Sequence, residues 1–132
     1  MTRCVAGMVS WLALCAAMVA VPGCKGKSVD RYGLSGSVAF RGEPVPCGRV
    51  TFEPDAERGN AGPGTSAFIV DGRFSTIAGK GHCGGPHVIR ILGFRRPDAS
   101  DEGAGRELFA EHVVRVDLPR GDSQREFVVP DP

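Results

Sequence analysis

Short stretches of alternating apolar and polar residues dominate the chain after residue 33. In residues 34–40, Leu34, Val38 and Phe40 share one side with a glycine, and small or polar residues occupy the other side. Because successive side chains of a strand point to opposite faces, this alternation predicts a half-buried β-strand. The same pattern predicts seven strands in all, over residues 34–40, 49–53, 66–70, 73–77, 87–94, 112–118 and 124–129.

Turn-forming residues separate these predicted strands. Asp71-Gly72 predicts a tight hairpin, because glycine accepts a positive φ without steric cost. Two prolines in residues 44–48 exclude a helix there, and four glycines in residues 78–86 favour a crossing loop. Seven short strands separated by turns predict an all-β fold, a seven-stranded antiparallel β-sandwich.

The inward-facing positions of the predicted strands define an expected core. Its members are β-branched or aromatic residues, and burying each such side chain stabilises the fold by about 1.5–3 kcal/mol. They are Val38, Phe40, Val50, Phe52, Ile69, Phe74, Ile89, Ile91, Val114, Val116 and Phe127.

The first 23 residues have a different composition. A short basic segment containing Arg3 is followed by 17 uncharged residues, 5–21, which is near the lower limit for a helix that spans a bilayer. The small residue Gly23 then precedes Cys24. This arrangement is typical of a cleaved secretory signal helix, and the alternative is an uncleaved N-terminal anchor.

The four residues Val21-Pro22-Gly23-Cys24 resemble the lipobox of bacterial lipoproteins, although proline is less usual at its position. The resemblance implies that Cys24 becomes the first residue of the mature protein and carries the lipid. It divides the chain into a lipoprotein signal peptide (1–23), a lipidated tether (24–33) and a β-sandwich domain (34–130). It also implies an exported protein, lipid-anchored to a bacterial membrane in the cell envelope, at the outer membrane or the periplasmic face.

The charge of the expected mature protein is balanced. Of 16 basic residues only Arg3 lies before residue 24, and all 15 acidic residues follow it, so 15 positive charges face 15 negative ones. A nucleic-acid-binding domain needs a basic face, and so does a protein held electrostatically on anionic lipid. The composition argues against both classes.

Cys47 and Cys83 are the two cysteines that follow the lipidation site. An even number in an oxidising compartment favours a disulfide between them. Such a bond would enclose the 35 residues between them and contribute about 3–4 kcal/mol in the chain-entropy model.

Three alternatives to this disulfide stay open from the sequence. The two thiols could be free, one thiol could be a nucleophile with His82 or His87 as base, or both thiolates and both histidines could bind a metal. Neither a CxxC nor an HxxxH spacing supports the metal site.

Three segments resemble carboxypeptidase regulatory-like, or transthyretin-like, domains: residues 34–52, Asp71-Gly72-Arg73-Phe74 and residues 85–91. The whole chain is similar to short lipoproteins of this kind from planctomycete bacteria. The resemblance implies a prealbumin-like sandwich and no catalytic residues. Cys47, Cys83 and His87 depart from the residue types expected at their positions.

The sequence therefore predicts a lipid-anchored, non-catalytic envelope protein that acts as a binding or structural module. The expected partners are membrane lipid, through acylated Cys24, and another envelope protein or a polysaccharide. No cofactor or metal is predicted for it. The alternative is a small periplasmic metal, redox or thiol-dependent protein that uses Cys47, Cys83, His82 and His87. Transport of a small apolar ligand, by analogy with transthyretin, is a third hypothesis that rests on the fold alone.

Overall fold

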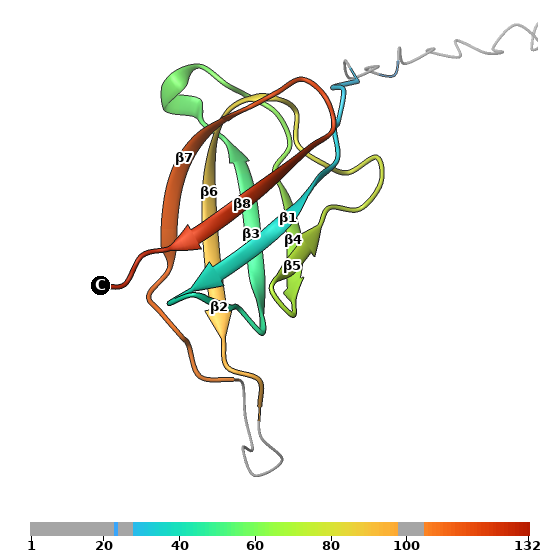
Figure 1. Cartoon of the computed structure of the whole chain (residues 1–132). Coiled ribbons are helices and arrows are strands. Elements are labelled where there is room, and N and C mark those ends of the chain that lie inside the picture. Colours follow the sequence, from blue (N-terminus) through green and yellow to red (C-terminus); the bar gives the residue numbers. More distant parts are fainter. Residues whose placement is uncertain (1–22, 24–27, 98–104) are drawn as a thin grey trace, which may run out of the picture.

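The computed structural model describes residue 23, residues 28–97 and residues 105–132 (Figure 1). The predicted signal helix and Cys24 lie outside the described residues. Within the described ranges, the one helical element is a 3₁₀ turn, η1 (Ala56–Arg58). None of the helical structure in these ranges has the length and apolar character needed to cross a membrane.

The rest of the regular structure is β-strand, which confirms the all-β prediction. The described strands are β1 (Leu34–Phe40), β2 (Glu43–Pro44), β3 (Cys47–Pro54), β4 (Thr65–Val70), β5 (Arg73–Ser75), β6 (Gly85–Phe94), β7 (His112–Leu118) and β8 (Ser123–Val129). Two strands, β1 and β7, have the predicted bounds, and five others differ from their predicted bounds by one or two residues at their ends. The two-residue strand β2 was not predicted, because it directly follows Gly42 and contains Pro44, two residues typical of turns.

All eight strands belong to one sheet. Its hydrogen-bonded order is β8-β1-β5-β4-β3-β6-β7, and β2 pairs with the end of β1. The sheet curls into a half-barrel, with β1 and β8 crossing in front of β3 and β6 in Figure 1. The finer expectation of a prealbumin-like sandwich stays a prediction.

Six of the seven strand pairs are antiparallel, and the antiparallel prediction is wrong for β1 and β8. These two strands pair in parallel along their whole length, which sets Val38 beside Phe127 and Phe40 beside Val129. Both strands alternate in the same phase, so the parallel pairing places their apolar residues on one buried face. Gly36 permits the close approach, since a Cβ there would lie 1.6 Å from a β8 carbonyl oxygen.

The longest ladder of the sheet joins β3 and β6 through eight residue pairs. At its centre Val50 pairs with Ile91 and Phe52 pairs with Ile89, and all four side chains are fully buried. The Phe52 ring also contacts Phe74 from β5, with ring centroids 5.9 Å apart. The β3–β6 ladder therefore forms the middle of the hydrophobic core.

The predicted core is confirmed at nine of eleven positions. Val114 and Val116 are only half-buried and pack against the margin of the core, because β7 is an edge strand that pairs with β6 and does not pair with β8. The core also contains apolar residues that were not predicted as core members, namely Leu34, Val45, Ala67, Leu118 and Val129.

Replacing Phe52 with alanine should destabilise the domain by about 3–5 kcal/mol, because a fully buried aromatic side chain leaves a cavity among well-packed neighbours. Urea denaturation monitored by circular dichroism measures this change. Phe68→Ala is the matched control, since Phe68 is 70% exposed and its loss should change stability by less than about 0.5 kcal/mol. Equal effects of the two substitutions would contradict the core assignment.

Candidate functional site

The glycine-rich loop before β6 is the part of the domain where polar and reactive side chains gather. The Arg31 guanidinium donates hydrogen bonds to the carbonyl oxygens of Gly81 at 2.9 Å and Lys80 at 3.1 Å. The backbones of Tyr32 and His82 exchange two hydrogen bonds, at 2.8 and 2.9 Å. The chain that enters the domain is therefore fastened directly to this loop.

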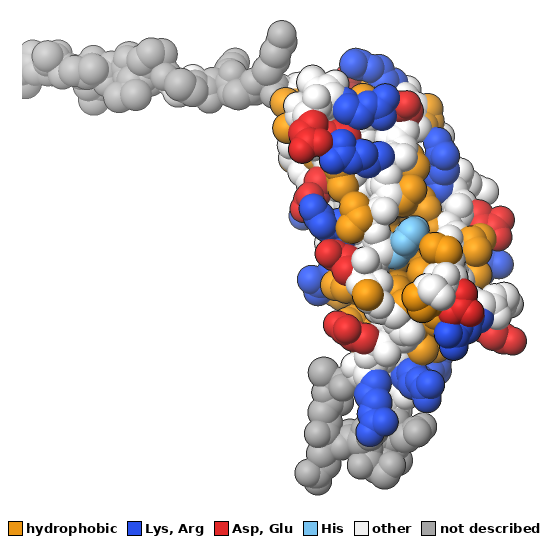
Figure 2. Space-filling view, turned by 90° about the vertical axis from the view of Figure 1, so that its left-hand side faces the viewer, with side chains coloured by type: hydrophobic (Ala, Val, Ile, Leu, Met, Phe, Trp, Pro, Cys, Tyr) orange, Lys and Arg blue, Asp and Glu red, His pale blue; other side chains and the backbone are white. Residues whose placement is uncertain are grey.

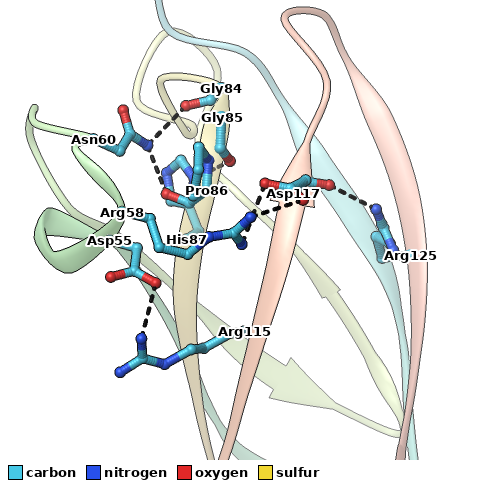
Figure 3. Close-up of polar contacts among 10 residues, drawn as sticks. All are labelled: Asp55, Arg58, Asn60, Gly84, Gly85, Pro86, His87, Arg115, Asp117 and Arg125. Carbon is cyan, nitrogen blue, oxygen red and sulfur yellow. Dashed lines mark hydrogen bonds and ion pairs between the residues drawn. The ribbon is translucent and has the colours of Figure 1, made fainter.

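A second clamp on this loop comes from Asn60, which follows η1 (Figure 3). Its Nδ2 donates to the carbonyl oxygens of Gly84 at 3.0 Å and Pro86 at 2.6 Å. The backbone N–H of Asn60 in turn donates to the carbonyl oxygen of Asp55 at 3.0 Å. The loop thus has fixed partners on two sides.

Two successive glycines give the loop its shape. Gly84 and Gly85 have φ angles of 76° and 82°, in the left-handed region that side-chain-bearing residues rarely adopt. A Cβ at Gly84 would also lie 2.8 Å from the Cγ atom of Arg120. This double turn folds the backbone so that His82, Cys83 and His87 become neighbours.

The ring of His87 is fully buried at the start of β6 and its orientation is set by the loop. Its Nδ1 lies 2.9 Å from the carbonyl oxygen of Gly85, which can only accept a hydrogen bond, so Nδ1 carries the proton. In the neutral ring Nε2 then has a free lone pair. This atom lies 3.8 Å from Sγ of Cys83, within hydrogen-bonding distance of a thiol.

His82 has the opposite tautomer. Its Nδ1 accepts a hydrogen bond from the backbone N–H of Gly84 at 3.0 Å, so the proton of the neutral ring is on Nε2. That Nε2 is buried and has no hydrogen-bond partner among the described residues. Burial lowers the pKa of His82 below its ordinary value, nearby His87 lowers it further, and Asp122 opposes the shift. The ring stays uncharged at neutral pH.

The structure does not bring Cys47 and Cys83 together, and both thiols are free. Cys47 pairs with Phe94 at one end of the β3–β6 ladder, whereas Cys83 lies beside His87, whose partner Pro54 is at the other end. Seven steps of about 3.3 Å each separate the two ends, and a disulfide requires Cα atoms within about 7 Å. The predicted Cys47–Cys83 bond therefore does not fit this strand register.

The four-ligand metal site is not assembled for the same reason. Cys83, His82 and His87 lie in one cluster, and Cys47 lies at the far end, where its Sγ contacts the Phe94 carbonyl oxygen at 3.4 Å. In the described parts of the chain, no three His, Cys, Asp or Glu side chains are arranged to hold a metal ion. Of the predicted reactive set, the structure joins only the thiol of Cys83 to histidine.

Sequence reasoning did not single out Asp55, whose carboxylate is buried. The side chain of Asp55 is 2% exposed and pairs with Arg115 from β7 at 3.3 Å (Figure 3). Its backbone carbonyl oxygen also accepts hydrogen bonds from the N–H groups of Arg58 and Asn60. Asp55 therefore shapes the turn that presents Asn60 to the glycine-rich loop.

The outer edge of β7 has different surroundings from those of the glycine-rich loop. The outer backbone edge of β7 has no strand partner within the described part of the fold, and the Arg125 guanidinium donates to the Asp117 carbonyl oxygen there at 2.8 Å. Figure 2 shows the face that β7 borders, where hydrophobic side chains and a histidine lie between basic and acidic ones. His112 is the histidine with exposed surface, since His82 and His87 are fully buried.

A second exposed apolar surface crosses the outward face of β4, β3 and β6. Phe68 and Val70 on β4 are 70% and 61% exposed. They pair with Arg49 and Cys47 on β3, and these pair with Leu92 and Phe94 on β6. The Arg49 guanidinium lies over the Phe68 ring at 5.3 Å. We call these six residues the outer apolar row.

No family model, curated protein or solved structure matches this chain. The resemblance to carboxypeptidase regulatory-like domains and to bacterial lipoproteins therefore stays a prediction from the motifs.

The stability of the domain should fall as the pH is lowered below about 6.5, the ordinary pKa of histidine. Because the pKa of His82 is lowered by burial, the unfolded chain binds a proton at this ring that the folded chain does not. This contribution to stability is complete above that pH and is lost below it. Urea denaturation at several pH values between about 7 and 5.5 measures the slope.

His82→Gln should flatten this slope, and His112→Gln should leave it unchanged because His112 is partly exposed on β7. The same slope in the wild type and in His82→Gln would contradict the assignment of His82 as a buried neutral ring.

Proposed function

We propose that this chain is an exported protein of the bacterial cell envelope, anchored to a membrane by lipid on Cys24. Its β-domain, of the carboxypeptidase regulatory-like, prealbumin type, serves as a non-catalytic binding or structural module. Another envelope protein or a polysaccharide is the expected partner. The proposal rests on the lipobox-like residues 21–24 and on the way the following chain joins the domain.

The attachment at Arg31 and Tyr32 is the observation that carries the proposal. These residues are hydrogen-bonded to the glycine-rich loop, so the chain is attached to the domain at a point seven residues after Cys24. In the proposal residues 24–30 serve as the tether, and a Gly/Ser-type linker of seven residues has an end-to-end distance of about 13–16 Å. A domain tethered in this way stands just clear of the lipid headgroups, as a lipid-anchored module requires.

The same attachment gives the proposed module an orientation. The glycine-rich loop, with Cys83, lies at the end of the domain where the tether enters, and therefore on the membrane side. The outer apolar row lies toward the opposite end of the β3–β6 ladder, near Cys47. Exposed apolar groups clustered in this way are typical of surfaces that contact other proteins, which supports a binding role directed away from the membrane.

Cys24→Ser should move the protein from the membrane fraction to the soluble fraction, or leave it unprocessed, because serine cannot accept the thioether-linked lipid. Fractionation of cells followed by immunoblotting measures this change. Two acyl chains or more would hold the wild type stably at the membrane.

Cys47→Ser is the matched control for this experiment. It also removes one thiol but lies in β3, outside the lipobox-like segment, and should leave the distribution unchanged. Normal processing and an unchanged membrane pool of Cys24→Ser would overturn the proposed lipid anchor.

A further inference from the structure

We propose that Cys83 is a reactive thiol, assisted by His87 as base, and that it is a site of exchange with small disulfides. This assignment goes beyond the binding role above and does not depend on the lipid anchor. It follows from three groups that the glycine-rich loop brings together: the Cys83 thiol, the His87 ring and the Gly85 carbonyl oxygen.

In this arrangement the Cys83 thiol is the nucleophile and the His87 ring is its base. The Gly85 carbonyl oxygen is the hydrogen-bond acceptor that orients the ring. The Gly85 carbonyl oxygen accepts from Nδ1 of His87 at 2.9 Å, which directs the basic Nε2 toward Cys83. The distance from Nε2 to Sγ is 3.8 Å, so the thiol can donate its proton to the ring. A thiolate is the nucleophilic form of cysteine, and a positioned histidine raises its availability at neutral pH.

His82 provides the second, independent observation. Its ring is fully buried and meets the His87 ring at 87°, with centroids 5.8 Å apart, and its Nε2–H has no partner among the described residues. Protonating this ring at Nδ1 would break its hydrogen bond from Gly84. His82 therefore stays neutral, so no second positive charge opposes the proton that His87 receives.

The two members of this pair differ in exposure. Cys83 is partly exposed, whereas His87 is fully buried beneath it. Gly62 from the neighbouring loop passes over the sulfur, and a Cβ at this position would lie 3.0 Å from Sγ. Because residue 62 is a glycine, no side chain from this position covers the sulfur.

The small disulfide is itself the oxidant in this exchange: the Cys83 thiol is oxidised to a mixed disulfide, and one sulfur of the small disulfide is reduced to a thiol. The Cys83 S–H bond breaks, its proton moves to Nε2 of His87, and the thiolate attacks one sulfur of a disulfide R–S–S–R. A new S–S bond forms between Cys83 and the attacked sulfur, the original S–S bond of the small disulfide breaks, and the leaving thiolate R–S⁻ takes the proton from His87 as R–SH. The protein gains one mixed disulfide and one small thiol is released.

Other charged groups surround this end of the domain and bear on its pH dependence. Asp122 acts on His82 through space. The Arg120 side chain lies against Gly84, and Arg58 pairs with Asp117 on β7 at 3.4 Å. These groups present charges of both signs, and none of them has a hydrogen bond or ion pair with Cys83 or His87.

The test uses the full chain and bis(2-hydroxyethyl) disulfide, a small neutral probe. The mixed disulfide is quantified on each cysteine-containing peptide by mass spectrometry after an acid quench. Cys47 is the internal control, because it is partly exposed like Cys83 but, among the described residues, its sulfur hydrogen-bonds to backbone carbonyl oxygens and not to a histidine. We expect Cys83 to react about tenfold faster than Cys47 at pH 7, and we expect this difference to vanish in denaturant.

His87→Gln should lower the Cys83 rate about tenfold and leave the Cys47 rate unchanged, and His112→Gln should leave both rates unchanged. The Cys47 rate and the circular dichroism spectrum report whether each variant is folded. If His87→Gln does not fold, the test is the ratio of the Cys83 rate to the Cys47 rate in the wild type. This ratio is compared between the native and the denatured protein. Equal rates for Cys83 and Cys47 in the native wild type, or an unchanged rate in folded His87→Gln, would overturn the proposal.

Discussion

The eight-residue ladder between β3 and β6 is the constraint on which the rest of this structure depends. Its centre supplies four fully buried side chains, from Val50 and Phe52 on β3 and from Ile89 and Ile91 on β6. The two ends of the ladder determine the surroundings of the two cysteines. One end holds Cys47 among backbone carbonyl oxygens, and the other holds His87 next to Cys83. A strand register shifted by one residue would move this whole buried set to the outward face. The core therefore fixes the register, and the register keeps Cys47 and Cys83 at opposite ends of the ladder.

The glycine-rich loop places Cys83 next to His87 at one end of this ladder. Gly84 and Gly85 supply the backbone turn, and Asn60 and Arg31 hold the loop from two sides. Both histidines hydrogen-bond to the backbone of this loop in opposite directions. Nδ1 of His82 accepts from the N–H of Gly84, and Nδ1 of His87 donates to the carbonyl oxygen of Gly85. The chain enters the domain through Arg31, so this point of entry and the Cys83 thiol lie at the same end of the domain.

Much of the fold follows from the sequence, because alternation reports directly which side chains face the core. Strands β1 and β7 and nine core residues follow from it. Alternation does not report which strands are neighbours. The parallel pairing of β1 with β8 depends on contacts between the ends of the chain, and it leaves Val114 and Val116 at a half-exposed edge.

The candidate site was less accessible from the sequence. Cysteine and histidine types singled out Cys83 and His87, but counting cysteines favoured a bond that the strand register does not allow. Asn60 acts through two side-chain hydrogen bonds and Asp55 through an ion pair, in each case to a distant segment, and their local sequence indicates only a loop. The glycines of residues 78–86 did signal an unusual backbone, yet their effect on the histidine tautomers required the folded geometry.

The separation of the two thiols by the β3–β6 ladder is the central claim, and peptide mapping without reduction tests it most directly. The protein is unfolded in the presence of an alkylating reagent, digested, and analysed for linked peptides. The structure predicts that Cys47 and Cys83 each carry the alkyl group or a separate small thiol. A monomer in which the Cys47 and Cys83 peptides are joined to each other would contradict the register and the site built on it.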